Sequence, residues 1–279
     1  MPRIAAVLLA AGLTFLAGLG CAAEPYTFGI APQFEQRKLF AIWKPVMDEL
    51  TKRTGMQFKF ASTFSVPEFE QAVARGEYDF IYVNPYHLYK ERSRQGYTPL
   101  VRDQTPLHGI VAVRKDSPLK NIRELDGKSL AVPSPNAIGA SMLVRAELER
   151  LHGIRTTMIN AKSHSSAYLH AINKLTDAAG GVEKTFVEQS KAIQDELRIL
   201  FKTRDFPSHP IAAHPRIPEK IRDQVRQAFI DMSASSQSEH LLGNIPMSKA
   251  IPASFDDYQV LRTLNLDAYW TDPGDSAKP

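Results

Sequence analysis

The chain alternates short apolar strands with amphipathic helices from residue 26 onward, and this alternation limits its fold more than any other feature. A strand pattern at 26–30 precedes a helical pattern at 39–53, in which apolar residues recur at helical spacing. The expected elements that follow are a strand at 57–61, a helix at 66–75, a strand at 80–83 and a helix at 85–94. This β-α-β-α order predicts an α/β fold with a parallel sheet covered by helices.

The rest of the chain repeats the same order. Strands are expected at 109–113, 130–132, 156–159, 177–182 and 198–201, and helices at 137–151 and 165–174. A strand at 211–213 then leads to helices at 218–234 and 255–264, and the tail from Thr271 is expected to be disordered. Two α/β units side by side predict a cleft between them, where the carboxyl ends of strands commonly hold ligands.

The N-terminus has the parts of a secretory signal. A basic start at Arg3 is followed by an apolar run from Ile4 to Leu19 and by small residues up to Ala23. This predicts a signal peptide at 1–23 and an exported protein. Cleavage before Cys21 would leave a lipid-modified cysteine, and cleavage after Ala23 would leave a soluble chain; the sequence leaves both open.

Cysteine usage and charge exclude several classes of protein. Cys21 is the only cysteine, so the chain cannot form an internal disulfide and has no thiolate downstream for catalysis or metal binding. The formal net charge is only +4 and no long basic run occurs, so nucleic-acid binding has no support. A mild positive balance fits an anionic small ligand.

The stretch 129–151 predicts an anion-binding turn. A short apolar strand meets Pro133-Ser134-Pro135-Asn136, and a helical pattern follows with Asn136 at its N-cap. The first helical turn carries small residues, among them Gly139 and Ser141. Free backbone N–H groups at a helix start, together with the helix dipole, favour an anion there.

Six segments carry a resemblance to a known family: Phe28 to Pro32, Gly76 to Tyr86, Val113 to Pro118, Asp126 to Ala131, Ser163 to Ser166, and Phe206 to Ile211. In order and spacing they resemble the periplasmic phosphonate/phosphite/phosphate-binding receptors of ABC importers. The resemblance implies an α/β fold of the two-lobed, type II periplasmic binding protein kind. Each lobe would be a mixed, mostly parallel sheet flanked by helices.

The resemblance also implies how the lobes divide the chain. Lobe 1 would comprise 24–113 and 207–270, and lobe 2 would comprise 114–206, with 271–279 as the disordered tail. The hinge between the lobes would lie at two crossovers, near 113–115 and 203–206. Ligand binding would close the hinge, and a membrane partner would recognise the closed form.

In such receptors a turn rich in Ser and Thr at a helix start holds the phosphonate oxygens, a histidine at another helix start contacts the oxyanion, and an aromatic residue ends a strand of lobe 1. His164 and Tyr82 match the last two. The ligand-binding residues that the resemblance and the turn together predict are Tyr82, Asn84, Tyr86, Ser134, Asn136, Ala137, Ile138, Gly139, Ser141, Ser163, His164, Ser165, Glu183 and His209.

The chain departs from the family pattern in ways that bear on the ligand. His209 stands where aminophosphonate-binding relatives carry an Asp that pairs with the ligand amine, and an imidazole cannot hold an ammonium group as a carboxylate does. The ligand is therefore expected to lack an amine. Glu183 lies near the other amine-binding carboxylate, although Gly180-Gly181 before it also fits close backbone approach at a strand end. Phe64 replaces a Tyr, which removes a hydroxyl.

We expect a monomeric periplasmic solute-binding protein that captures phosphate, phosphite or a simple phosphonate for an ABC permease, with no cofactor and no metal. An enzyme is not expected, because no metal-binding His spacing or nucleophile–base set appears. Two alternatives stay open. One is a receptor that reports to a membrane sensor kinase or cyclase, and the other is a metal receptor that uses His164, His209 and a carboxylate.

Overall fold

The computed structural model describes residues 24–245 and 247–272. The predicted signal peptide with Cys21, and residues 273–279 of the predicted tail, lie outside this part of the chain. Within it, no helix is both long enough and apolar enough to cross a membrane.

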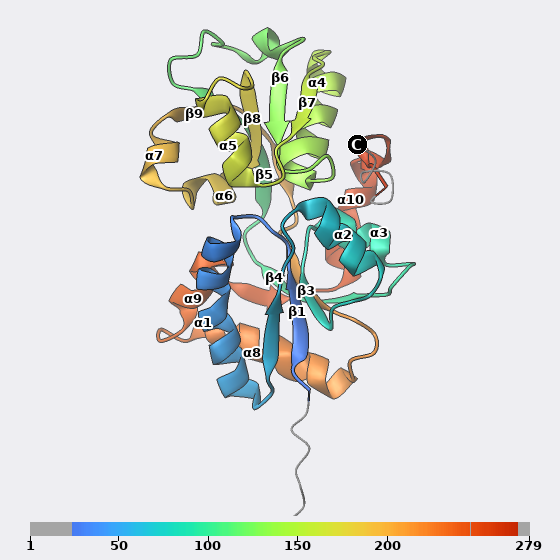
Figure 1. Ribbon diagram of the computed structural model, residues 1–279. Coiled ribbons are helices and arrows are strands. Elements are labelled where there is room, and N and C mark those ends of the chain that lie inside the picture. Colours follow the sequence, from blue (N-terminus) through green and yellow to red (C-terminus); the bar gives the residue numbers. More distant parts are fainter. Residues whose placement is uncertain (1–23, 246, 273–279) are drawn as a thin grey trace, which may run out of the picture.

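The first sheet lies in the lower lobe of Figure 1 and has the strand order β11-β4-β10-β3-β1-β2. Strand β1 pairs in parallel with β2 and β3, whereas β10 and β11 pair antiparallel with their neighbours. The sheet is therefore mixed, as expected, but it is not mostly parallel. The strands are β1 (Tyr26–Ile30), β2 (Phe58–Ala61), β3 (Phe80–Tyr82), β4 (Thr98–Asp103), β10 (Pro210–Ala213) and β11 (Ala250–Pro252). The helices of this lobe are α1 (Gln36–Thr54), α2 (Val66–Ala74), α3 (Pro85–Glu91), α8 (Glu219–Ala234) and α9 (Glu239–Asn244).

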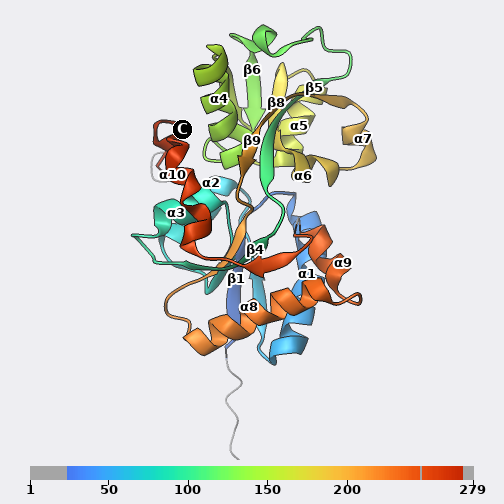
Figure 2. The same cartoon turned by 180° about the vertical axis from the view of Figure 1, so that it is seen from behind.

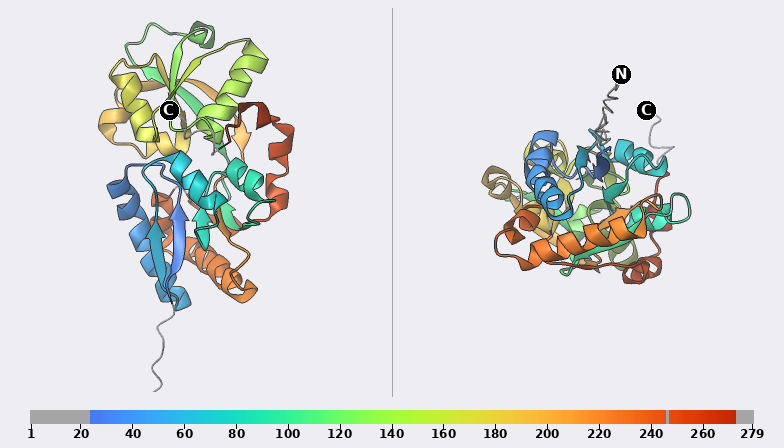
Figure 3. Two further views of the ribbon diagram at one scale, coloured as in Figure 1. Left: turned by 45° about the vertical axis from the view of Figure 1, so that its right-hand side comes forward. Right: turned by 90° about the horizontal axis from the view of Figure 1, so that it is seen from below.

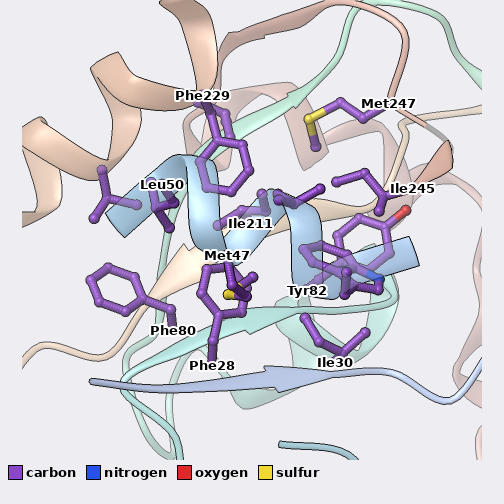
Figure 4. Close-up of a cluster of buried hydrophobic side chains, with 14 of the residues drawn as sticks. Phe28, Ile30, Met47, Leu50, Phe80, Tyr82, Ile211, Phe229, Ile245 and Met247 are labelled. Atoms are coloured by element: carbon purple, nitrogen blue, oxygen red, sulfur yellow. The ribbon is translucent and has the colours of Figure 1, made fainter. Parts of the chain in front are cut away.

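Aromatic side chains dominate the core of lobe 1. Phe28 of β1 stacks on Phe80 of β3 with ring centroids 5.8 Å apart, and Trp43 of α1 packs on Phe28 at the same centroid distance. Figure 4 shows this core, in which Phe229 of α8 also packs on Phe28, with ring centroids 6.3 Å apart. Burial of several aromatic rings supplies much of the stability of this lobe, since each removes a large apolar area from water.

The second sheet forms the upper lobe and has the order β7-β6-β8-β5-β9. Here β6 pairs in parallel with β7 and β8, and β5 pairs antiparallel with β8 and β9. The strands are β5 (Leu107–Arg114), β6 (Ser129–Val132), β7 (Thr157–Asn160), β8 (Ala178–Val182) and β9 (Leu197–Phe206). The helices are η1 (Ile122–Leu125), the π-helix η2 (Ile138–Met142), α4 (Leu143–His152), α5 (His164–Ile172), α6 (Glu183–Val187) and α7 (Lys191–Gln194).

The first crossover between the lobes lies earlier in the chain than predicted. The whole of β5 belongs to the second sheet, so the chain enters lobe 2 at Leu107 and not at 113–115. It returns after Phe206, the last residue of β9, and the link at 207–209 leads to β10. The apolar pattern of β5 would suit a buried strand of either sheet, so the pattern alone could not show where lobe 1 ends and lobe 2 begins.

The C-terminal segment, residues 255–272, runs from lobe 1 onto lobe 2, and we call it the strap. It contains η3 (Phe255–Tyr258), α10 (Val260–Thr263) and η4 (Leu266–Tyr269). In Figures 1–3 it lies beside α3 of lobe 1 and reaches α4 of lobe 2. Its apolar side chains share one buried cluster with Tyr86 of lobe 1 and Leu143 of lobe 2. Thr271, which the sequence assigns to a disordered tail, is held in place by hydrogen bonds to Asn136.

Candidate functional site

A small cavity of about 40 Å³ lies between the lobes, at the carboxyl ends of strands from both sheets. This volume accommodates a few water-sized groups, since one water needs about 10–15 Å³. Lobe 2 contributes Pro133, Ala137, Ile138, Gly139, Ala140, His164 and Val182. Lobe 1 contributes Ala31, Pro32, Gln33, Val66, Asn84 and His209.

A larger hollow of about 390 Å³ lies at the far end of lobe 2, between the start of β6 and the end of β5. Arg114 there is already bonded to Asp116 and to the carbonyl of Ile172. Because this hollow is at the amino end of β6 and away from the lobe interface, we take the smaller cavity as the candidate site.

The turn 137–140 enters the cavity because two glycines allow its backbone to pack directly on the sheet. A Cβ at Gly109 of β5 would lie 2.1 Å from the carbonyl oxygen of Gly139, and one at Gly180 of β8 would lie 2.0 Å from that of Ala140. The N-cap is Ala137 and not the predicted Asn136, and it makes no side-chain capping bond. The amides of Asn136 and Ala137, which were predicted to bind the anion, instead donate to the hydroxyl and the carbonyl of Ser134. The donors for an anion at this uncapped helix start are therefore the amides that follow Ala137.

His164 and His209 approach the cavity from opposite lobes. Ser163 caps α5 by accepting a hydrogen bond from the Ser166 amide, and this places His164 at the first position of the helix. The ring of His209 stacks on Tyr82, with centroids 5.5 Å apart. Within the described residues the Nδ1 atom of each histidine is buried without a hydrogen-bond partner.

Both histidines are neutral in this setting. Burial lowers the pKa of His164 to about 4. Burial, with smaller contributions from His164 and Lys184, lowers the pKa of His209 to about 3. A neutral imidazole offers one N–H donor and one nitrogen acceptor, so each ring is able to bond to an oxygen that carries a proton or to one that lacks it.

Among the predicted residues, Asn84 lines the cavity, whereas Ser134 and Tyr82 lie outside its lining and support its walls. Asn84 caps α3 and donates from Nδ2 to the carbonyl of Asn136 at 2.7 Å, which joins the lobes directly. Ser134 accepts a hydrogen bond from the Asn136 amide at 3.2 Å. Tyr82 lies behind His209 and is buried against Trp43.

Other predicted residues are directed elsewhere by their own partners. The hydroxyl of Ser141 contacts the sulfur of Met158, and that of Ser165 donates to Gln189. Tyr86 donates to Asp267 of the strap at 2.8 Å.

Glu183 likewise stands outside the lining of the cavity. Its carboxylate pairs with His108 and with Lys202. Because these side chains already have partners, the polar groups that line the site are the backbone turn, the two histidines, Gln33 and Asn84.

The sequence pattern did not predict the lobe 1 wall formed by Ala31, Pro32 and Gln33. These residues directly follow β1, and the rule that ligands gather at the carboxyl ends of strands could have identified them. Val66, Pro133, Ala140 and Val182 were also missed. They carry no polar group, so only the geometry reveals them.

Among the described residues no carboxylate lines the cavity, so the histidine pair lacks the third ligand that the metal-receptor alternative requires. In the part of the chain that the structure describes, no group of three or more His, Cys, Asp or Glu side chains is placed to hold a metal ion.

Two lobes of mixed sheet, a double crossover and an interlobe cavity define a type II periplasmic binding protein. The model of the family described as "ABC transporter, phosphonate, periplasmic substrate-binding protein" matches residues 28–258, and the chain belongs to this family. Members are exported, non-enzymatic proteins that bind a small molecule and deliver it to a membrane permease. A search of curated proteins finds no match.

Solved structures show the same fold at low sequence identity. A binding protein component of an ABC phosphonate transporter from Pseudomonas aeruginosa has a TM-score of 0.79 and 16% identity, over 86% of this chain and 85% of that one. PhnD1 from Prochlorococcus marinus, in complex with methylphosphonate, has a TM-score of 0.74 and 12% identity, over 86% and 96%. XAC2383 from Xanthomonas citri, bound to chloride, has a TM-score of 0.69 and 16% identity, over 90% and 99%.

Proposed function

We propose that this protein captures a small oxyanion, namely phosphate, phosphite or a simple phosphonate, in the cavity between its lobes. The observation that carries the proposal is the backbone turn 137–140, which faces His164 and His209 across a space of about 40 Å³. The amides at the helix start and the two imidazoles supply donors on several sides of a tetrahedral anion.

The charge of the lining favours a singly charged ligand. Within residues 24–245 and 247–272 no Lys, Arg, Asp or Glu lines the cavity, and both histidines are neutral. Burying a second negative charge without a counter-charge is costly, whereas a protonated oxygen is able to donate to an imidazole nitrogen. We therefore expect the monoanion to bind in preference to the dianion.

Apart from Gln33 and Asn84, the remaining wall is apolar, and this apolar part suits a P–H or P–CH₃ group better than a fourth phosphate oxygen. Val66, Ile138 and Val182 form this wall. A hydroxyl placed against them would lose its hydrogen bonds to water without replacement. Phosphite and methylphosphonate are thus the favoured candidates, and the relative crystallised with methylphosphonate supports this choice.

A charge placed in the turn tests the position of the anion. Ala137→Asp should weaken binding at least about a hundredfold, because two like charges about 4 Å apart near a protein surface repel by about 4 kcal/mol. Ala137→Asn, which has nearly the same shape, should retain most of the affinity. Calorimetry on refolded protein freed of carried-over solute, with phosphite, methylphosphonate and phosphate, measures the difference. Equal affinity of the two variants for every ligand would show that the anion binds elsewhere.

Removal of one imidazole tests its role as a donor. His164→Ala should weaken binding by about 1.5 to 3 kcal/mol, which is the range for a hydrogen bond to a charged group. His170→Ala, on the same helix but outside the cavity lining, is the matched control and should bind normally. An unchanged dissociation constant in His164→Ala would remove this residue from the site.

A further inference from the structure

Asn136, which the sequence analysis assigns to the ligand, binds three other parts of the protein. Its Nδ2 donates to the carboxyl of Glu70 in α2 at 3.0 Å and to the carbonyl of Thr271 in the strap at 2.8 Å. Its Oδ1 accepts from the Thr271 amide at 2.8 Å, and its carbonyl accepts from Asn84. Asn136 immediately precedes Ala137, so these bonds tie the ligand turn of lobe 2 to lobe 1 and to the strap.

The strap itself is bonded to both lobes. In lobe 1, Tyr86 and Lys90 both reach Asp267. In lobe 2, Arg150 donates to two strap carbonyls and Glu149 accepts from Tyr269. The contact between Asn136 and Thr271 therefore belongs to a continuous set of bonds that spans the lobe interface.

Glu70 is the one carboxyl in this set that is almost fully buried, with 1% of its surface exposed. In the described part of the chain its second oxygen, Oε1, has no hydrogen-bond partner. A buried carboxylate without a cation is costly, but a neutral carboxylic acid is not. Opening the lobes would move the turn away from Glu70 and let water reach the carboxyl.

The groups that face Glu70 give no compensating positive charge. From α3, Glu91 adds a negative group, and Arg94 beyond the helix is bonded to Glu91. His87, also on α3, is buried and neutral, and Asp272 of the strap acts on Glu91. Burial raises the pKa of Glu70 to about 8, with the Asn136 bond opposing and Glu91 reinforcing this shift.

We propose that Glu70 is a positioning residue, which in its protonated form holds Asn136 and keeps the ligand turn in the closed arrangement. Ligand capture is thereby linked to uptake of a proton. The inference rests on the proposed function, because the turn in question is the proposed anion site. Burial in the closed form favours the protonated carboxyl, and this fixes the direction in which closure depends on pH. Between the ordinary carboxyl pKa of the open form and the raised value of the closed form, closure becomes less favourable as pH rises.

Glu70→Gln separates the proton from the hydrogen bond, since an amide keeps an oxygen acceptor for Asn136 and does not titrate. Binding of phosphite or methylphosphonate should be measured from pH 5.5 to 7.5 for both proteins. The ratio of the wild-type dissociation constant to that of Glu70→Gln should rise by up to about tenfold per pH unit. Titration of the ligand and of the histidines affects both dissociation constants equally and therefore cancels in their ratio. Glu239→Gln, an exposed carboxyl in α9, is the control and should follow the wild type.

A constant ratio across this range would overturn the proposal. Small-angle X-ray scattering without ligand gives an answer that does not depend on the identity of the ligand. At pH 8 Glu70→Gln should be more compact than the wild type, and at pH 5.5 the two should agree. If none of the oxyanions binds, the proposed function fails while this comparison still decides the role of Glu70, and equal compactness at both pH values would exclude it.

Discussion

Gly109→Ala is expected to destabilise the protein by about 3 kcal/mol or more and to abolish oxyanion binding. The added Cβ would lie 2.1 Å from the carbonyl oxygen of Gly139, a distance that forces the backbone of one element to move. A side chain could rotate away from such a clash, but a carbonyl within η2 cannot. The amide of Gly109 also donates to the hydroxyl of Thr203 at 2.9 Å, which fixes this strand position from the other side.

The affected carbonyl belongs to the turn that we propose holds the anion, so stability and binding should fall together. Urea unfolding measures the first and calorimetry the second. Gly243→Ala is the matched control, because a Cβ at this position in α9 meets nothing within 4 Å. That variant should be neutral or stabilised by up to about 1 kcal/mol, as alanine favours a helix over glycine. Normal stability of Gly109→Ala would mean that the turn does not pack on β5 as described.

The order of strands and helices was readable from the sequence because most elements combine a clear period with a clear stop. The helix predicted at 39–53, for example, corresponds to α1, which ends before Gly55 in the left-handed conformation. The prediction began three residues late, because the capping side chain of Glu35, which accepts from the amides of Arg37 and Lys38, was not used. Strands β4 and β11 were missed because neither precedes a helix at the expected spacing. They pair antiparallel with strands that are distant in the sequence, and such pairing leaves no local signal.

The candidate site was only partly predictable, for a related reason. Local chemistry singled out the turn at 137–139, and the family pattern added His164 and His209; all of these line the cavity. The direction of the Asn136 side chain could not be foreseen, since its partners Glu70 and Thr271 are 66 and 135 residues away. A pattern reports which groups a segment carries, but only the packing of distant segments decides where those groups point.

Stability should fall as the pH drops from 7 to 5, by about 2 kcal/mol per pH unit near pH 5.5. His87, His164 and His209 are buried, and burial lowers their pKa values to about 3, 4 and 3. The unfolded chain binds a proton at each of them below about pH 6.5, and the folded protein does not. Their stabilising contribution is thus complete above pH 6.5 and is lost as pH falls toward the folded values.

Glu70 and Glu91 act in the opposite sense, since burial raises the pKa of each carboxyl and the folded protein binds their protons first. The three histidines make the unfolded chain bind more protons than the folded protein, and the two carboxyls partly offset this. The remaining difference of about one to two protons sets how steeply the free energy of unfolding changes with pH. Urea unfolding at pH 5.5, 6 and 7 measures it. His209→Gln should reduce the slope by about 1.4 kcal/mol per pH unit, whereas the exposed His240→Gln should leave it unchanged. A stability that is flat between pH 7 and 5 would show that water reaches these imidazoles in the folded protein, and the neutral-histidine site would then be wrong.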